Sequence, residues 1–345
     1  MSVVENAWQT RWHPLSLFML PWSWLFALIA AVRRLAYRRG WLTIHTSCVP
    51  VLVVGNVTVG GVGKTPLVLW LANRIRARGL TVGVVSRGYG RATQGLRIAH
   101  ACSTADEIGD EPLLFAQAGF PVAVAERRAD AVAALAGDVN LVIADDGLQH
   151  YAMQRAAEIV VVDGDRGFGN GRRLPAGPLR EPLSRLPAAA LVLVRNGVPQ
   201  QVLACSGVSG HRFDVDAATL QSLDGLRSEP LARWSDRRVH AVAGIGYPER
   251  FFAALRDKGL DVIAHPFADH HRYRPEELQF GDGLPVLMTG KDAVKCRDFA
   301  QPDWWSVEIA IRMQPELEAA LDALVQELAG QPAQSPVFDS ENARG

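Results

Sequence analysis

A glycine-rich loop between an apolar run and a helical segment constrains the fold more than any other feature of the chain. Residues 58–65 read TVGGVGKT, after an apolar run at 49–54 and before a helical pattern at 65–78. The usual phosphate-loop pattern is G-x-x-x-x-G-K-[ST], and this loop departs from it only at its first position. Glycines let backbone N–H groups face a phosphate, and the following helix adds the positive end of its dipole. The sequence predicts that a nucleotide phosphate binds Thr58, Val59, Gly60, Gly61, Val62, Gly63, Lys64 and Thr65.

A loop of this kind usually works with a metal ion and a carboxylate. Its lysine reaches the β- and γ-phosphates, its threonine hydroxyl ligates Mg²⁺, and a carboxylate at the end of another strand helps to hold the metal. Two apolar runs end in suitable groups: LVIADDG carries Asp145 and Asp146, and IVVVDGD carries Asp163 and Asp165. A doubled carboxylate is costly unless a cation lies between its members, which favours Asp145 and Asp146.

Short apolar runs alternate with helical stretches through most of the chain. Such runs occur at 80–85, 121–125, 141–144, 158–162 and 190–194. This alternation predicts an α/β fold like that of P-loop NTPases, with a mostly parallel sheet covered by helices on both faces. The rhythm breaks at about 206–238, and a second α/β set follows at 239–243, after Pro248, at 260–264 and at 284–288, with a closing amphipathic helix at 317–328. We therefore predict an N-terminal apolar, membrane-associated helix at 1–40, a P-loop domain at 41–225, a smaller α/β domain at 226–330 and a loose tail at 331–345.

The N-terminal region contains 19 residues without a charge, at 14–32, followed by Arg33, Arg34, Arg38 and Arg39. As one helix this run would be about 28 Å long, close to the thickness of a bilayer core. It could span the membrane, lie in the interface or pack as a core helix; a cleaved signal peptide fits poorly because the basic cluster follows the apolar run. The position of the arginines places the downstream chain in the cytoplasm. We predict membrane contact without choosing between spanning and lying flat.

Charge and cysteine content exclude other classes of protein. Lys and Arg number 36, as do Asp and Glu, so the net charge is zero and a nucleic-acid partner is disfavoured. The four cysteines include no C-x-x-C pair, which argues against a zinc ribbon and a disulfide scaffold and fits a reducing compartment. No obligate protein partner is evident.

Six motifs stand in one order along the chain: GNVTVGGVGKTP at 55–66, SRGYGR at 86–91, GDEP at 109–112, DDGLQH at 145–150, LPAGPLREP at 174–182 and FADHHRY at 267–273. Together they resemble the tetraacyldisaccharide 4′-kinase family of lipid A biosynthesis. The resemblance implies a P-loop kinase at the cytoplasmic face of a bacterial inner membrane. Such a kinase transfers the γ-phosphate of ATP, with Mg²⁺, to the 4′-hydroxyl of a tetraacylated glucosamine disaccharide 1-phosphate and forms lipid IVA. Its partners would be this acylated lipid and the inner-membrane lipids.

The resemblance also implies roles for individual residues. Asp110 of GDEP matches the general base, and His270 matches the histidine that pairs with it, although His271 leaves an ambiguity of one residue. We expect only closure of two domains to bring Asp110 and His270 into hydrogen-bond reach. The same resemblance adds Glu111 to the metal set, which would then comprise Thr65, Glu111, Asp145 and Asp146.

Arginines in several motifs are candidates for binding phosphate. A triphosphate donor and a lipid 1-phosphate both call for planar cationic groups; the candidates are Arg87, Arg91, Arg127, Arg173 and Arg180. One motif departs from the resemblance, since MTGKDAVK at 288–295 has Gly290 where the family usually has glutamate. The competing hypothesis is a membrane-bound P-loop ATPase or GTPase switch. A GTPase would be expected to carry N-K-x-D after a late strand, and VLVRN at 192–196 is followed by Gly197 and Val198 instead.

Overall fold

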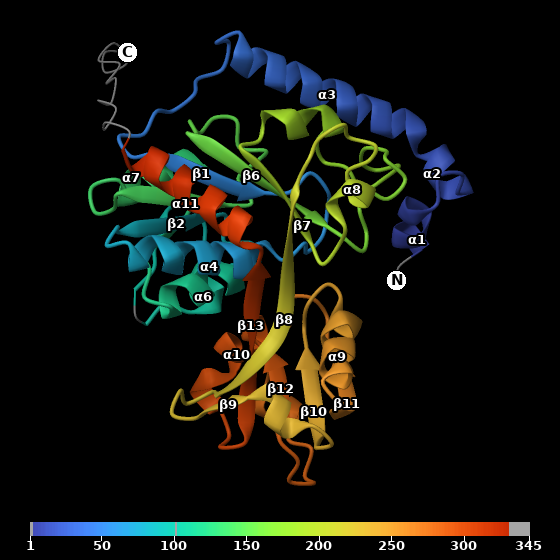
Figure 1. Ribbon diagram of the computed structural model, residues 1–345, viewed down its shortest axis with the longest axis vertical. Coiled ribbons are helices and arrows are strands. Elements are labelled where there is room, and N and C mark those ends of the chain that lie inside the picture. Colours follow the sequence, from blue (N-terminus) through green and yellow to red (C-terminus); the bar gives the residue numbers. More distant parts are fainter. Residues whose placement is uncertain (1–2, 101, 331–345) are drawn as a thin grey trace.

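The computed structural model describes residues 3–100 and 102–330. A single mixed sheet runs through two lobes in the order β11-β10-β12-β13-β8-β7-β6-β1-β5-β2-β4-β3, with β9 paired to β8. We call residues 41–210 with helix α11 the larger lobe and residues 223–303 the smaller lobe. The long strands β8 (His211–Ser222) and β13 (Trp304–Met313) form an antiparallel pair that connects the lobes, as Figure 1 shows.

The larger lobe confirms the predicted alternation of strands and helices. Its strands are β1 (Val51–Gly55), β2 (Val82–Ser86), β3 (Arg97–Ile98), β4 (Val122–Val124), β5 (Leu141–Asp145), β6 (Ala157–Asp163) and β7 (Leu191–Arg195). Its helices are α4 (Lys64–Ala77), α5 (Ala105–Ile108), α6 (Asp110–Gln117), α7 (Arg128–Leu135), η1 (Leu183–Ala188), α8 (Pro199–Val202) and α11 (Pro315–Ala329). All strand pairs here are parallel except β3 with β4.

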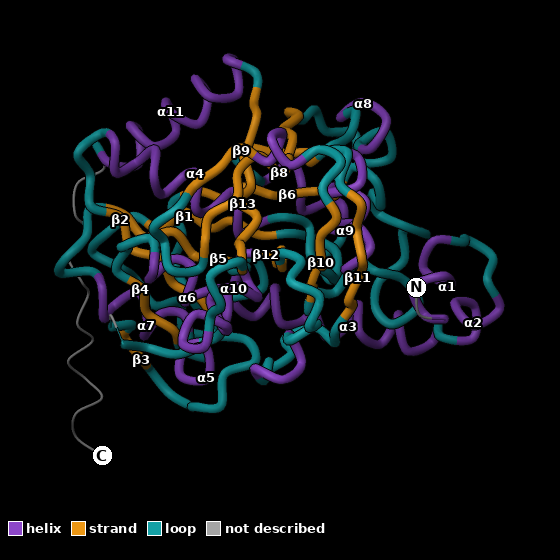
Figure 2. Tube along the Cα trace, turned by 90° about the horizontal axis from the view of Figure 1, so that it is seen from below, coloured by secondary structure: helices purple, strands orange, loops and turns teal. Residues whose placement is uncertain are grey.

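Alternate side chains of β1 show why the sheet is covered on both faces. Leu52 and Val54 pack with α4, α6 and α11 on one face, while Val51 and Val53 pack with α7 and α8 on the other. Successive strand residues point to opposite faces, so a strand buried on both sides reads as a continuous apolar run. In the view from below, α4 and α11 lie together on one side of β1 and β2, and α7 lies on the other (Figure 2).

The smaller lobe repeats the pattern on a smaller scale. Its elements are β9 (Ser228–Pro230), η2 (Leu231–Trp234), β10 (Arg238–Ala243), α9 (Pro248–Asp257), β11 (Asp261–Pro266), η3 (Pro275–Leu278), β12 (Val286–Thr289), α10 (Gly290–Cys296) and η4 (Arg297–Phe299). Helix α9 covers one face of its strands and α10 the other. The predicted boundary at 225/226 stays a prediction; in the structure α11 returns to the larger lobe, where Leu317, Leu321, Val325 and Leu328 join the core around α4.

The N-terminal region forms α1 (Val3–Gln9), α2 (Pro14–Phe18) and α3 (Leu20–Arg38). The uncharged run is therefore divided between two helices, and Pro21 lies in the first turn of α3, where proline is tolerated. Helix α3 continues through Arg33, Arg34 and Arg38. In residues 3–100 and 102–330 no helix is long and apolar enough to cross a membrane. Figure 1 shows α3 along the end of the larger lobe that faces away from the smaller one.

Candidate functional site

The glycine loop lies between β1 and α4, as the sequence predicts. Gly60 and Gly63 have positive φ values of 98° and 81°, which glycine adopts without a steric penalty. A Cβ at Gly63 would also lie 2.8 Å from Cδ of Arg195. Val59 donates its N–H to the carbonyl of Pro178 at 2.9 Å, so the LPAGPLREP segment supports the loop from outside.

The loop lysine and threonine are each held by a carboxylate. Lys64 Nζ lies 3.0 Å from Asn56 Oδ1 and 3.2 Å from Asp146 Oδ1. Thr65 Oγ1 donates to Glu111 Oε1 at 3.2 Å. The loop therefore meets DDGLQH on one side and the first turn of α6 on the other. Asn56 was not predicted to take part, although it lies inside the GNVTVGGVGKTP motif.

The two carboxylates that follow β5 differ in environment. Asp145 is buried, and in the part of the chain that the structure describes neither of its carboxylate oxygens has a hydrogen-bond partner. Burial and the nearby Glu111 raise the pKa of Asp145 to about 7. Burial opposes ionisation of Asp146 too, but Lys64 and Arg180 outweigh it and lower the pKa of Asp146. Arg180 Nη1 lies 3.0 Å from Asp146 Oδ2.

The structure brings Asp110 and His270 together across the two lobes. Asp110 is the first residue of α6, and its Oδ2 lies 2.9 Å from His270 Nδ1 and 3.3 Å from Lys295 Nζ. Burial raises the pKa of Asp110, but the hydrogen bond from His270 and the charge of Lys295 lower it overall. The hydrogen bond to Asp110 raises the pKa of His270. The lobes place the two side chains in contact in this structure, and the requirement for closure stays a prediction.

The ambiguity between the two adjacent histidines is resolved by geometry. His270 adopts a positive φ of 60°, a conformation found where tertiary contacts impose it. His271 Nε2 instead lies 3.1 Å from Glu277 Oε2, within the smaller lobe. Only the first histidine of FADHHRY therefore contacts Asp110.

The five candidate arginines are spread over the molecule. Arg180 alone among them contacts a predicted metal carboxylate. Arg87 is exposed, and Arg91 contacts Glu126 and the Gly95 carbonyl. Arg127 pairs with His45 and Asp130, and Arg173 donates to the carbonyl of Ala27 in α3. Binding of lipid or nucleotide phosphate by these residues stays a prediction.

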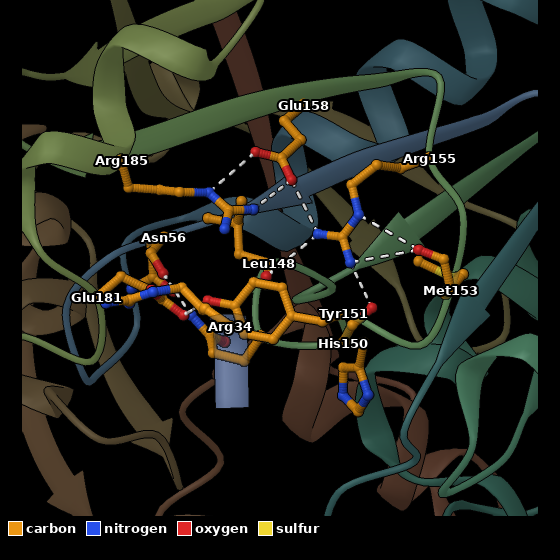
Figure 3. A network of polar contacts seen from close by, with 11 residues as sticks. Arg34, Asn56, Leu148, His150, Tyr151, Met153, Arg155, Glu158, Glu181 and Arg185 are labelled. Atoms are coloured by element: carbon orange, nitrogen blue, oxygen red, sulfur yellow. Dashed lines mark hydrogen bonds and ion pairs between the residues drawn. The ribbon is translucent and has the colours of Figure 1, made fainter. Parts of the chain in front are cut away.

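A polar network ties helix α3 to the loops of the site (Figure 3). Arg34 of α3 contacts Glu181 at 2.8 Å, and Glu181 accepts a hydrogen bond from Tyr151. Glu181 is nearly fully buried and directly follows Arg180 in the chain. Arg155 donates to the carbonyls of Leu148, His150 and Met153 and pairs with Glu158, which also binds Arg185. The network fixes DDGLQH and LPAGPLREP relative to each other.

The predicted metal ligands fit a magnesium ion in chemistry. They are a hydroxyl and carboxylates, the donors that Mg²⁺ prefers, and the buried oxygens of Asp145 lack another partner among the described residues. Within residues 3–100 and 102–330, no group of three or more His, Cys, Asp or Glu side chains is arranged to hold a metal by itself. Substrate phosphates commonly supply the remaining ligands of Mg²⁺, so these residues would complete a site together with a nucleotide.

A phosphate loop between a strand and a helix, beside an aspartate–histidine pair, defines a P-loop phosphotransferase. The family model described as tetraacyldisaccharide-1-P 4′-kinase matches residues 15–326. This chain belongs to that family of kinases.

Individual relatives agree with the family assignment. The tetraacyldisaccharide 4′-kinase of Thiobacillus denitrificans is 46% identical over 90% of this chain and 95% of its own length. That of Aeromonas salmonicida is 45% identical over 94% of both chains. The solved structure of LpxK from Aquifex aeolicus in complex with ATP has a TM-score of 0.76 and 28% identity, covering 90% of this chain and 99% of the other.

Proposed function

We propose that this site transfers the γ-phosphate of ATP to the 4′-hydroxyl of a tetraacylated glucosamine disaccharide 1-phosphate and forms lipid IVA. Membership of the family makes the chain an ATP-dependent tetraacyldisaccharide 4′-kinase. The observation that carries the assignment to this site is the Asp110–His270 contact beside the phosphate loop. A regulatory P-loop switch needs no group to accept a hydroxyl proton, whereas a kinase does.

Asp110 suits the role of general base by its position and its charge. Its neighbour in the chain, Glu111, contacts Thr65 of the phosphate loop, so an acceptor hydroxyl bound beside Asp110 would lie close to a phosphate bound by that loop. The lowered pKa keeps Asp110 ionised at neutral pH. The imidazole Nδ1–H of His270 donates to Asp110 and fixes the direction of the free lone pair, and orientation matters more than basicity in such transfers.

The transfer exchanges one bond at the γ-phosphorus for another. The acceptor oxygen forms a bond to the γ-phosphorus while its proton passes to Asp110. The bond from the γ-phosphorus to the bridging oxygen breaks, and its electron pair leaves with ADP. Lys64 neutralises charge on the β- and γ-phosphates, and Mg²⁺ bound at Thr65, Glu111, Asp145 and Asp146 would supply further charge neutralisation.

His270 and His271 should differ in their effect on catalysis. We expect His270→Ala to lower kcat by at least ten times more than His271→Ala, because only His270 orients the base while His271 pairs with Glu277. Steady-state kinetics of both variants with Mg²⁺-ATP and the lipid acceptor measure this ratio. Equal losses would assign the role to the loop as a whole and not to one ring.

We also propose that α2 and α3 attach the protein to the cytoplasmic face of the inner membrane. Polar groups on these helices face inward, since Ser23 Oγ donates to the Arg173 carbonyl at 2.9 Å and Ser16 is buried beside Asn170. Large apolar residues face outward and are exposed, among them Trp22 and Trp24 at 61% and 67%. This arrangement, flanked by arginines, suits an interfacial helix on an anionic surface.

The anchoring surface can be tested without removing the helix. We expect Trp22→Ser/Trp24→Ser/Leu28→Ser to lower partition onto anionic vesicles by roughly 10³-fold or more, since burial of each large apolar side chain contributes at least about 1.5 kcal/mol and each 1.4 kcal/mol is about tenfold. The residual binding should weaken further with salt. Vesicle sedimentation measures the partition, and Ile98→Ser/Leu226→Ser, at two exposed positions outside α2 and α3, is the control. Unchanged partition of the triple variant would place the membrane contact on another surface.

A direct assay tests the proposed reaction. Purified protein, Mg²⁺-ATP and the tetraacylated disaccharide 1-phosphate should give a phosphorylated lipid and ADP in equal amounts, and a nucleotide acceptor should give none. ATP hydrolysis without any phosphorylated lipid would favour the P-loop switch instead.

A further inference from the structure

Helix α10 of the smaller lobe presents two lysines to the first turn of α6. Lys291 contacts the carboxylate of Glu111, and Lys295 Nζ lies 3.3 Å from Asp110 Oδ2. The lysines are four residues apart and so share one face of the helix, while the two carboxylates are adjacent at the start of α6. This face of α10 therefore reaches both carboxylates of the GDEP motif.

The two lysines are held in different ways. Lys295 is anchored in its own lobe, since Nζ lies 3.1 Å from Asp292 Oδ1 and donates to the His271 carbonyl at 3.1 Å. For Lys291, Glu111 is the one hydrogen-bond or ion-pair partner within residues 3–100 and 102–330. Lys295 is thus fixed beside Asp110, whereas Lys291 can exchange a single partner for another anion.

The partner of Lys291 is shared with the phosphate loop. Oε1 of Glu111 accepts both the Lys291 ammonium and the Thr65 hydroxyl. In P-loop enzymes that hydroxyl lies beside the metal that bridges the β- and γ-phosphates. Only the carboxylate of Glu111 therefore lies between the Lys291 ammonium and the loop hydroxyl beside which the terminal phosphate would bind.

Carboxylates and cations already interact around this place before a nucleotide arrives. Three cations, Lys64, Arg180 and Lys291, contact the carboxylates of Asp146 and Glu111. A triphosphate adds negative charge that further cations must neutralise as the phosphoryl group is transferred. Of the three cations, only Lys291 belongs to the smaller lobe. Its position beside the phosphate loop therefore depends on contact between the lobes.

We propose that Lys291 is a catalytic residue that leaves Glu111 and binds the γ-phosphate of ATP, as a cation supplied by the smaller lobe to the phosphate loop of the larger one. The inference rests on the proposed kinase function and adds a phosphate-binding group to that site. Lys291 stays protonated throughout; it neutralises charge on the phosphoryl oxygens while the proton of the acceptor passes to Asp110.

The test compares nucleotides that differ by the γ-phosphate. In the full-length protein with Mg²⁺, we expect Lys291→Met to weaken ATP binding by roughly tenfold or more and ADP binding by less than about threefold, because a charge-assisted hydrogen bond to the γ-phosphate is lost. With the lipid acceptor, kcat should fall about 100-fold. Lys291→Arg should recover part of both losses because it keeps the charge. The matched control is Lys258→Met, which removes a smaller-lobe lysine that pairs with Asp216 instead.

The outcomes separate this role from a purely structural ion pair. Equal weakening of ATP and ADP, or unchanged preference for ATP, would overturn the proposal and leave Lys291 as a contact between lobes. Calorimetric binding needs no lipid, so a loss of ATP preference would stand even if the wild-type protein failed to phosphorylate the lipid. Conversely, full lipid kinase activity in Lys291→Met would remove Lys291 from the mechanism and leave the proposed function intact.

Discussion

Lys64→Ala should lower kcat by roughly 10³-fold or more while the protein remains folded. Such enzymes act almost entirely by positioning and charge stabilisation, so removing the cation at the β- and γ-phosphates removes a large part of what they supply. The fold should persist because Asp146, the carboxylate that Lys64 contacts, keeps its ion pair with Arg180. Single-turnover kinetics with saturating Mg²⁺-ATP measure the effect.

Two comparisons make this result specific. Thermal unfolding and circular dichroism should match the wild type, and Lys258→Ala, a change in the smaller lobe, should keep its full rate. Near-normal lipid phosphorylation by folded Lys64→Ala would refute the assignment of residues 58–65 as the phosphate loop.

The larger lobe was predictable because its signals are local. A buried parallel strand such as Val51–Gly55 is a continuous apolar run, and the glycines before Lys64 mark a turn that few other residues can form. The register of the six motifs then predicted the candidate site residues by resemblance. Local pattern and resemblance together predicted the phosphate loop, Asp145, Asp146 and the Asp110–His270 pair.

The connection between the lobes was not predictable in the same way. Strand β13 carries Glu308 and Arg312 and is partly exposed, so it lacks the apolar run that marked the other strands, and β8 lies in the segment where the rhythm breaks. Their antiparallel pairing joins residues about 90 positions apart, such as Ile311 with Val215. Pairing over that separation depends on tertiary contacts that no short pattern records.

The same limit explains why the cations of α10 were missed. Lys291 and Lys295 stand in MTGKDAVK, which the sequence marked only for the departure at Gly290. Their meaning comes from the carboxylates they meet, and those lie about 180 residues away on α6. A lysine exposed to solvent and a lysine that points into a site look alike in sequence. Only the packing of the lobes distinguishes them.

The Asp110–His270 contact predicts strongly non-additive losses. Asp110→Ala removes the base, and we expect kcat to fall about 10²–10⁴-fold, the usual range for general acid–base catalysis. His270→Ala removes the hydrogen bond that orients the base, so its loss should be large as well. The ATP KM should change little for either variant, since neither side chain contacts the residues of the phosphate loop directly.

The double variant decides whether the two residues act as a unit. If His270 works by orienting Asp110, it has nothing to orient once Asp110 is gone, so Asp110→Ala/His270→Ala should be little slower than Asp110→Ala alone. Steady-state kinetics of the four proteins in the cycle give this coupling, and His271→Ala in the Asp110→Ala background is the matched control. Losses that multiply fully would mean that His270 acts on the substrate independently, in which case the 2.9 Å contact between Nδ1 and Oδ2 would be structural and the base would have to work without it.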